Sequence, residues 1–152
     1  LGDSREYEMI ESVGDLTASA LKYSFPVLGM VYPRGPNLVL SNRDATKGVA
    51  HAARVAWELG CHVAKVPWTG DGESFAEVCS AVPIPVLIAG GPSGKPFIKT
   101  LEIVESAVSS GASGVCIGRQ IFASTNRIAR IKALRAIVHE GASADQAATF
   151  LE

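Results

Sequence analysis

Residues 61–71, CHVAKVPWTGD, hold the pattern on which the fold prediction rests. A short apolar run ends at Pro67 and at a turn rich in glycine and aspartate, and the segment SFAEVCSAV follows it with helical spacing. Short strands that alternate with helices predict β/α units in a parallel sheet, and near-continuous apolar strands are typical of a sheet covered on both faces. Three further apolar runs have the same form, namely FPVLGMVY (25–32), IPVLIAGG (84–91) and GVCIG (114–118).

Stretches with helical spacing separate these runs, and a leading helix over residues 4–23 precedes the first. Asp44 is the predicted N-cap of a helix through AHAARVAWEL, and Gly60 ends that helix. PFIKTLEIVESAVSS, closed by Gly111, follows the third run. The fourth run is followed by NRIARIKALRAIVHE, whose predicted apolar face contains Ile128, Ile131, Leu134 and Val138.

A helix followed by four β/α units corresponds to half of an eight-unit barrel, whose usual size is about 250 residues. The sequence contains no linker, low-complexity segment or charge block that would divide it. We therefore predict an α/β fold of the (β/α)8 TIM-barrel type, of which residues 1–152 supply four parallel units as a single domain.

Composition and charge exclude several classes of protein. The 152 residues suffice to bury a core, and a net charge of −1 with 19% charged residues gives no basic field for nucleic acid. No apolar run is long enough to span a membrane. Cysteines in separate apolar runs, Cys61, Cys79 and Cys116, predict reduced thiols and a cytoplasmic location. Because the chain starts with LGDS rather than methionine, we expect a fragment or a processed product.

Lys65 is the first candidate for chemistry, because a lysine in an apolar run is rarely buried without a partner or a use. Active groups of β/α barrels lie where strands end and the following loops begin. Alternation places Lys65 on the face of Cys61 and predicts that Tyr32, from the preceding strand, converges with it. Desolvation favours a neutral amine, which forms a Schiff base with a carbonyl while the tyrosine moves protons. The alternative is a lysine that reaches solvent and a tyrosine that packs in the core.

Two glycine turns form a second candidate site. AGGP (89–92) follows the third predicted strand, and GRQ (118–120) follows the fourth. Glycines let backbone N–H groups approach a phosphate closely, and the last two strands of a barrel are a frequent phosphate site. Arg119 adds its charge or only its backbone N–H. The alternative is that both are tight turns that require positive φ.

Other side chains near the strand ends are weaker candidates. Trp68 lines a pocket or seals the barrel rim, and Asp71 caps the next helix or contacts substrate. Arg34, in the YPRG turn, is a further candidate for the substrate pocket. The histidines have no spacing that suggests a metal site, so structural roles are favoured for His51, His62 and His139.

Five ordered motifs, M-x-Y-P-R-G, V-A-H-A-A-R, K-x-P-W-T-G-D, I-A-G-G-P and G-R-Q-I-F, resemble the class I (Schiff-base) aldolases of archaeal fructose-bisphosphate aldolase type. The related aminodideoxyheptulosonate synthases share this scaffold. The resemblance covers nearly the whole chain and implies strands five to eight of a TIM barrel. It implies that Lys65 is the Schiff-base lysine and Tyr32 the general acid/base. It further implies that a substrate phosphate is held by Ala89, Gly90, Gly91, Gly118 and Arg119.

The resemblance also implies a reaction and its partners. The reaction would be reversible aldol cleavage or transfer on a phosphorylated keto-sugar, with no metal or other cofactor. The predicted assembly is a homo-oligomer or a chain completed by a missing N-terminal half-barrel.

The sequence departs from the family pattern at three points. Met30 stands where the archaeal fructose-bisphosphate aldolases have an aromatic residue, which favours the synthase-like branch. Gln120 replaces a more usual asparagine, and the family's first-strand aspartate has no counterpart. Two other functions stay open, namely a non-catalytic phosphate-binding half-barrel and a flavin-dependent barrel oxidoreductase, which would be yellow.

Overall fold

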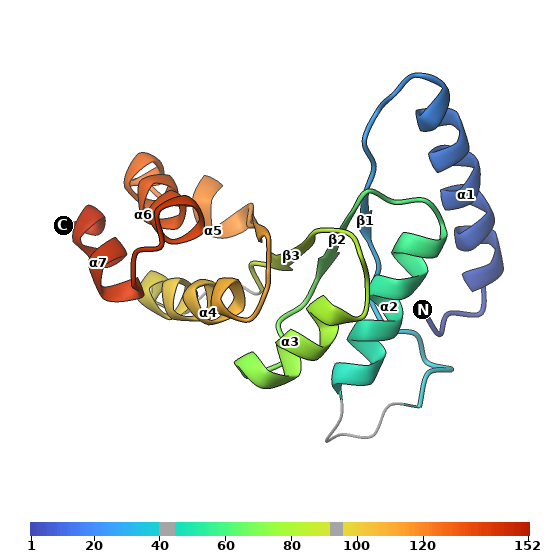
Figure 1. Cartoon of the computed structure of the whole chain (residues 1–152), viewed down its shortest axis with the longest axis horizontal. Helices are drawn as coiled ribbons and strands as arrows, with labels where there is room; N and C mark the ends of the chain where they lie inside the picture. Colours follow the sequence, from blue (N-terminus) through green and yellow to red (C-terminus); the bar gives the residue numbers. More distant parts are fainter. Residues whose placement is uncertain (40–44, 92–95) are drawn as a thin grey trace.

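The computed structural model describes residues 1–39, 45–91 and 96–152, so the predicted helix cap Asp44 lies outside the described residues. Figure 1 shows the leading helix, the central strands and the helices that connect and follow them. The elements in chain order are α1 (Glu6–Lys22), β1 (Leu28–Met30), α2 (Ala45–Glu58), β2 (Val63–Val66), α3 (Gly72–Ser80), β3 (Val86–Ala89), α4 (Phe97–Ser109), β4 (Gly114–Cys116), α5 (Arg119–Phe122), α6 (Arg127–Glu140), α7 (Ala144–Ala148) and a 3-10 turn (Thr149–Leu151).

The four strands form one parallel sheet in the order β1-β2-β3-β4. Each β/α unit therefore adds a strand beside the previous one, which confirms the predicted leading helix and four parallel units. The strands are shorter than the apolar runs, because each run includes residues that lead into or out of the strand. The register aligns one row of residues across the sheet: Met30, Lys65, Leu87 and Gly114.

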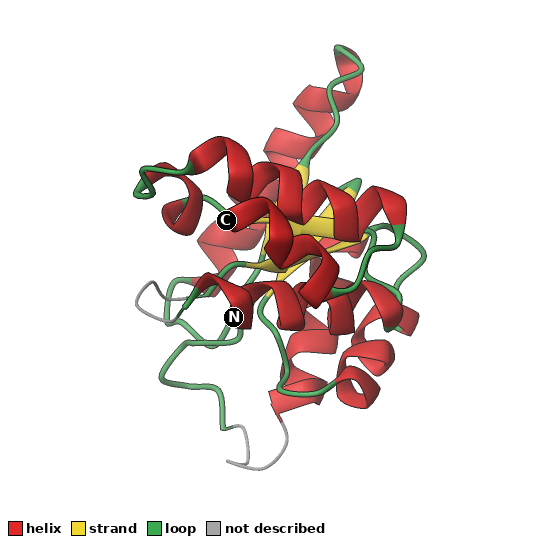
Figure 2. Ribbon diagram, turned by 90° about the vertical axis from the view of Figure 1, so that its left-hand side faces the viewer, coloured by secondary structure: helices red, strands yellow, loops and turns green. Residues whose placement is uncertain are grey.

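Helices cover one face of the sheet, where alternate strand residues are buried. Phe75 of α3 is fully buried against this face, and burial of such a side chain stabilises the fold by about 1.5–3 kcal/mol. A second cluster joins α4, α6 and α7 around Leu101 and Ile137. Figure 2, viewed from the side of the C-terminus, shows these helices in front of the strands. The strand residues that pack under α2 and α3 are Ala64, Val66, Val86 and Ile88.

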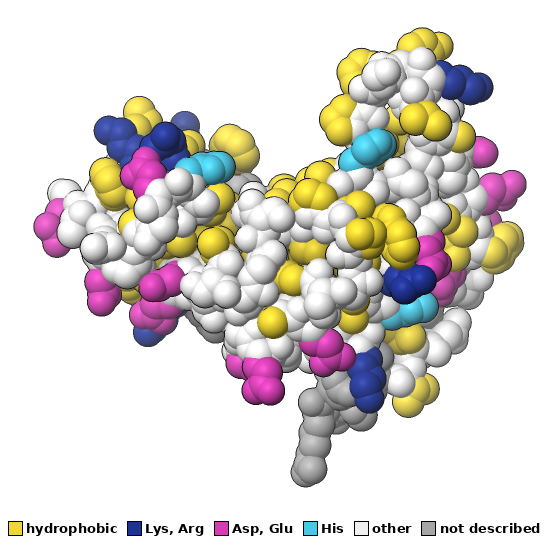
Figure 3. Space-filling model, viewed as in Figure 1, with side chains coloured by type: hydrophobic (Ala, Val, Ile, Leu, Met, Phe, Trp, Pro, Cys, Tyr) yellow, Lys and Arg dark blue, Asp and Glu magenta, His cyan; other side chains and the backbone are white. Residues whose placement is uncertain are grey.

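The opposite face of the sheet is left open by the described residues. Met30 is 58% exposed and Leu28 is exposed beside it, while Val63 and Leu87 are half-buried. Figure 3 shows a hollow between the α6 side and the α1 side, with hydrophobic side chains along its floor. The near-continuous apolar strands predict a sheet covered on both faces, whereas the described residues cover only one face.

The leading helix α1 contacts the rest of the chain along a narrow line. Thr17 donates a hydrogen bond from Oγ1 to the carbonyl oxygen of Leu59 at 2.6 Å, and Val13 packs against the core. Gly60 has φ +85°, as expected for the glycine that ends α2. The apolar side chains of α1 that are exposed are Tyr7, Met9, Ile10, Leu16 and Leu21.

One prediction of side-chain orientation is wrong. Cys61, predicted on the face of Lys65, lies in the helix-covered core, because β2 begins only at Val63 and its alternation does not extend back. Burial raises the pKa of the Cys61 thiol. Ile131, Leu134 and Val138, predicted to share one face of α6, together line an apolar hollow of about 450 Å³ on the open side of the sheet. Ile128 and Ile131 of that face are exposed.

Candidate active site

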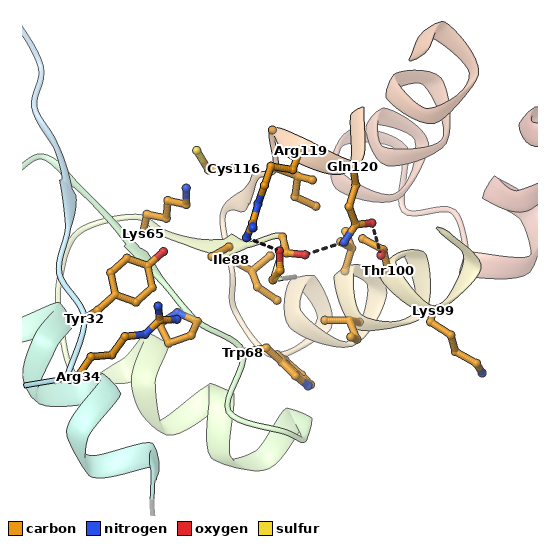
Figure 4. A pocket seen from close by; sticks show the side chains of 18 residues that line it. Tyr32, Arg34, Lys65, Trp68, Ile88, Lys99, Thr100, Cys116, Arg119 and Gln120 are labelled. Atoms are coloured by element: carbon orange, nitrogen blue, oxygen red, sulfur yellow. Dashed lines mark hydrogen bonds between the residues drawn. The ribbon is translucent and has the colours of Figure 1, made fainter. Parts of the chain in front are cut away.

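A cavity of about 830 Å³ lies where the strands end, at the edge from which the βα loops leave. Its size falls in the range of about 300–1,000 Å³ that is usual for small-molecule sites. Figure 4 shows its side chains, which come from the ends of all four strands and from the start of α4. The predicted site residues that line the cavity are Tyr32, Arg34, Lys65, Trp68, Ala89, Gly90, Gly91, Gly118 and Arg119.

Lys65 occupies the third position of β2, on the open face of the sheet, and is half-buried. The register sets it between Met30 of β1 and Leu87 of β3, so its nearest neighbours across the sheet are apolar. The open face still leaves the side chain partly in contact with solvent. The desolvated environment that the sequence predicts therefore requires further cover and stays a prediction.

Tyr32 lies two residues beyond the last residue of β1, and its side chain extends into the same cavity as Lys65 (Figure 4). Within the described residues its hydroxyl makes no hydrogen bond and is available to a ligand. Its carbonyl oxygen accepts a hydrogen bond from the backbone nitrogen of Leu1 at 2.6 Å. The predicted convergence of Tyr32 and Lys65 on one pocket is thus what the structure shows.

Residues 1–2 fasten the loop that carries Tyr32. The Gly35 N–H donates to the Leu1 carbonyl oxygen at 2.7 Å, and the Asn37 N–H donates to the Gly2 carbonyl oxygen at 2.9 Å. A Cβ atom at Gly35 would lie 1.8 Å from the Gly2 carbonyl carbon, so the two backbones cross in contact and only glycine fits. These contacts hold the backbone of the YPRG turn, and they thereby fix the position of the Tyr32 Cα atom from which the side chain extends.

The lining of the cavity is basic. Lys65 and Arg34 lie on one side of the cavity and Arg119 on the other, while Lys99 lines its edge from the start of α4 with its amine directed away (Figure 4). No carboxylate is present among the described residues that line it. Arg34 stacks over the Tyr32 ring at 4.7 Å, and Lys99 is paired with Glu102 at 2.8 Å. This charge distribution suits an anionic ligand.

The two glycine turns meet at one corner of the cavity. Ala89 pairs with Cys116 at the ends of β3 and β4, and the side chain of Arg119 donates to the Gly91 carbonyl oxygen at 3.1 Å. Gly91 has φ +63°, so the turn requires positive φ there, as the alternative interpretation expected. Gly90 has a second requirement, since a Cβ atom there would lie 2.7 Å from Ile117. The structure thus brings the predicted turns together, and their contact with phosphate stays a prediction.

Of the two weaker candidates Trp68 and Asp71, only Trp68 lies at the cavity. Trp68 lines the cavity, with its ring centroid 5.0 Å from that of Phe75. Asp71 is outside the cavity: its carboxylate caps α3 by accepting from the Ser74 N–H at 2.8 Å, which confirms the predicted cap. The hydrogen bonds from Ser74 hold the pKa of Asp71 below its usual value.

The histidines are absent from the lining of the cavity. His62 accepts a hydrogen bond at Nδ1 from the Val27 N–H at 3.1 Å, which is a structural role of the kind predicted. In the part of the chain that the structure describes, no group of three His, Cys, Asp or Glu side chains is placed to hold a metal ion.

Four polar residues that line the cavity, Lys99, Thr100, Cys116 and Gln120, were not predicted as site residues from the sequence. Cys116 follows Gly114 on the inner face of β4, so the two-residue period of a strand was a signal for it. Thr100 and Gln120 lie on α4 and α5, and their side chains are joined by a hydrogen bond of 2.6 Å. Such a contact between residues 20 positions apart has no local sequence signal.

Four parallel β/α units, with a lysine on the open face of the sheet and glycine turns after the last two strands, form part of a β/α barrel. The model of the DeoC/LacD family aldolases matches residues 1–124. The chain belongs to the DeoC/LacD aldolase family.

Individual relatives agree with this family. The chain is 40% identical over 139 residues to 2-amino-3,7-dideoxy-D-threo-hept-6-ulosonate synthase 1 of Archaeoglobus fulgidus, covering 91% of this chain and 50% of that protein. It is 35% identical over 141 residues to the class 1 fructose-bisphosphate aldolase of Thermoproteus tenax, covering 92% of this chain and 53% of that protein. The chain therefore spans about half the length of the curated relatives it matches.

Solved structures give the same result. An archaeal fructose-1,6-bisphosphate aldolase whose catalytic lysine is covalently bound to the carbinolamine intermediate superposes with a TM-score of 0.82 at 32% identity. The superposition covers 90% of this chain and 54% of that one. Across the described residues, none of the helices is both long enough and apolar enough to cross a bilayer.

Proposed function

We propose that this chain supplies the Schiff-base half of a class I aldolase that acts on a phosphorylated keto-sugar. The observation that carries the proposal is Lys65, held on the inner face of β2 between Met30 and Leu87 and facing the same cavity as Tyr32. A relative of similar fold carries its intermediate on a lysine, which supports this assignment. A cytoplasmic location and a homo-oligomeric state remain predictions.

The proposed reaction begins when the neutral amine of Lys65 attacks the keto carbon of the sugar. The carbinolamine takes up a proton from solvent and loses water to give an iminium ion. The iminium ion withdraws electrons from the carbon–carbon bond one position further along, between its α and β carbons. Tyr32, as the general base, accepts the proton of the hydroxyl group on the β carbon, the bond breaks, and an aldehyde leaves. The resulting enamine takes a proton from the Tyr32 hydroxyl at its carbon. Addition of water then releases the ketone and restores Lys65.

The basic lining supports a phosphorylated substrate. Ala89, Gly90 and Gly91 on one strand end and Gly118 and Arg119 on the next would surround a phosphate bound to the sugar. Backbone N–H groups and a guanidinium are the usual donors to such a group. The proposed site requires no metal or other cofactor, because the lysine itself supplies the electron sink.

The second candidate reaction is the transaldolase chemistry of an aminodideoxyheptulosonate synthase, which the 40% identity to the Archaeoglobus protein favours. Both reactions use the same lysine, so the acceptor decides between them. We expect full-length protein either to split fructose 1,6-bisphosphate into two trioses or to retain the enamine until another aldehyde accepts it. Product analysis by mass spectrometry with and without an added aldehyde distinguishes the two. A protein that releases neither product but binds phosphate would instead be the non-catalytic half-barrel.

We also propose that further β/α units cover the open face of the sheet, from the same polypeptide or from a second chain. The β1 and β4 edges carry no described strand beyond them, and their inner faces are apolar. Phe122, beside the β4 edge, is 74% exposed. Exposed strand edges and apolar patches of this kind are normally covered.

The 152-residue chain expressed alone should therefore show an assembly defect. We expect it to associate or aggregate in sedimentation experiments and to bind a hydrophobic dye such as ANS, with no aldolase activity. Co-expression with four N-terminal β/α units of a relative should suppress dye binding. A soluble, active monomer of this chain alone would contradict the proposal, and an active dimer would identify a second copy as the cover.

A further inference from the structure

Gln120 joins the two glycine turns to helix α4. Its amide nitrogen donates to the Gly90 carbonyl oxygen at 2.7 Å, and its amide oxygen accepts from Oγ1 of Thr100 at 2.6 Å. Thr100 is only 7% exposed, so its hydroxyl group is satisfied inside the protein by this contact. A flipped amide would set its oxygen against the Gly90 carbonyl oxygen, so the orientation of Gln120 is determined (Figure 4).

The backbone of Gln120 is fixed as well. Its carbonyl oxygen accepts a hydrogen bond from Arg130 of α6, and the Arg130 guanidinium lies 4.5 Å from the ring centroid of Phe97 at the start of α4. Both α4 and α6 therefore hold Gln120 in place. Because Gln120 is held at its backbone and at both ends of its side-chain amide, its hydrogen bond holds the Gly90 carbonyl oxygen in one position.

The position of the Gly90 carbonyl group decides the direction of the next N–H. The C=O and N–H of one trans peptide point in opposite directions. Because Gln120 holds the Gly90 carbonyl, the Gly91 N–H points away from Gln120, and within the described residues it donates to no acceptor. Gly91 is exposed and lines the cavity. The carbonyl oxygen of Gly91 accepts a hydrogen bond from the side chain of Arg119.

We propose that Gln120 is a positioning residue for the substrate phosphate: it sets the Gly90–Gly91 peptide so that the Gly91 N–H is directed at the phosphate. The inference rests on the proposed function, because it refines the phosphate site of that function. Gln120 itself does not contact the ligand. Its contribution is therefore selective for phosphorylated ligands and absent for unphosphorylated ones.

The test compares two ligands in the full-length protein. Dihydroxyacetone phosphate and dihydroxyacetone are titrated as Lys65 is trapped with borohydride, and half-saturating concentrations are measured. Gln120→Ala should raise the half-saturating concentration of dihydroxyacetone phosphate by about tenfold, because the hydrogen bond from the Gly91 N–H to the charged phosphate is lost. The half-saturating concentration of dihydroxyacetone, which has no phosphate, should rise by less than about twofold. Thr100→Val, which keeps the side-chain shape, should give a smaller change in the same direction. Gln146→Ala, outside the cavity, should change neither.

A second measurement does not depend on the Schiff base. Inorganic phosphate added to the wild-type protein should shift the NMR signal of the Gly91 amide, and Gln120→Ala should abolish that shift while the signals of glycines outside the cavity keep their positions. The proposal is overturned if both ligands weaken equally, or if phosphate leaves the Gly91 signal unmoved in the wild type. Absence of any trapped adduct, with the Gly91 response intact, would reject the proposed function and keep the role of Gln120.

Discussion

Replacement of Lys65 by methionine should abolish aldolase turnover in the full-length protein. Methionine keeps the length of an unbranched apolar side chain in the row between Met30 and Leu87, so the fold is retained. The amine that forms the covalent intermediate is lost, and we expect kcat to fall by about 10⁴-fold or more, as for other covalent nucleophiles. The measurement is the rate of triose release together with the midpoint of thermal unfolding.

The same residue should carry the label after borohydride reduction. Wild-type protein reduced in the presence of dihydroxyacetone phosphate should gain the ligand mass on the tryptic peptide that contains Lys65. Lys132→Met, an exposed position on α6, should label and turn over like the wild type. Label on another lysine, or full turnover by Lys65→Met, would show that the assignment of the nucleophile is wrong.

The fold could be predicted from the sequence because each of its units has a local signal. Short apolar runs bounded by glycine or proline gave strands, and glycines at positive φ such as Gly60 and Gly111 ended helices where expected. The direction in which a side chain points was harder to predict from the sequence near the ends of strands. Cys61 shows why: a period of two applies only within the strand, and the strand start cannot be located to one residue from an apolar run.

The site was predictable to the extent that it depends on strand ends. Lys65 and the glycine turns follow directly from the strand pattern, so the rule that barrel chemistry lies at strand ends was enough to find them. Gln120 depends on a hydrogen bond to Thr100 from a different unit, and that contact arises only in three dimensions. The exposed Ile128 and Ile131 are a further case, because a helical period shows which residues share a face and not what that face contacts.

Tyr32→Phe separates proton transfer from packing at the second catalytic position. The substitution keeps the ring over which Arg34 stacks at 4.7 Å and removes only a hydroxyl group that has no hydrogen bond within the described residues. A packing role therefore predicts little change. A role in general acid/base catalysis predicts that kcat falls by about 10²–10⁴-fold, whereas KM changes far less.

The intermediate itself gives the sharper measurement. If Tyr32 moves protons only after Lys65 has bound the ketone, Tyr32→Phe should still form the Schiff base, and borohydride should trap at least as much adduct as in the wild type. Tyr23→Phe, at a tyrosine that is 75% exposed and outside the cavity, controls for loss of a phenol elsewhere. Unchanged kcat would assign Tyr32 to packing. Loss of the trapped adduct would place its action before Schiff-base formation, because the covalent step would then need the hydroxyl group that phenylalanine lacks.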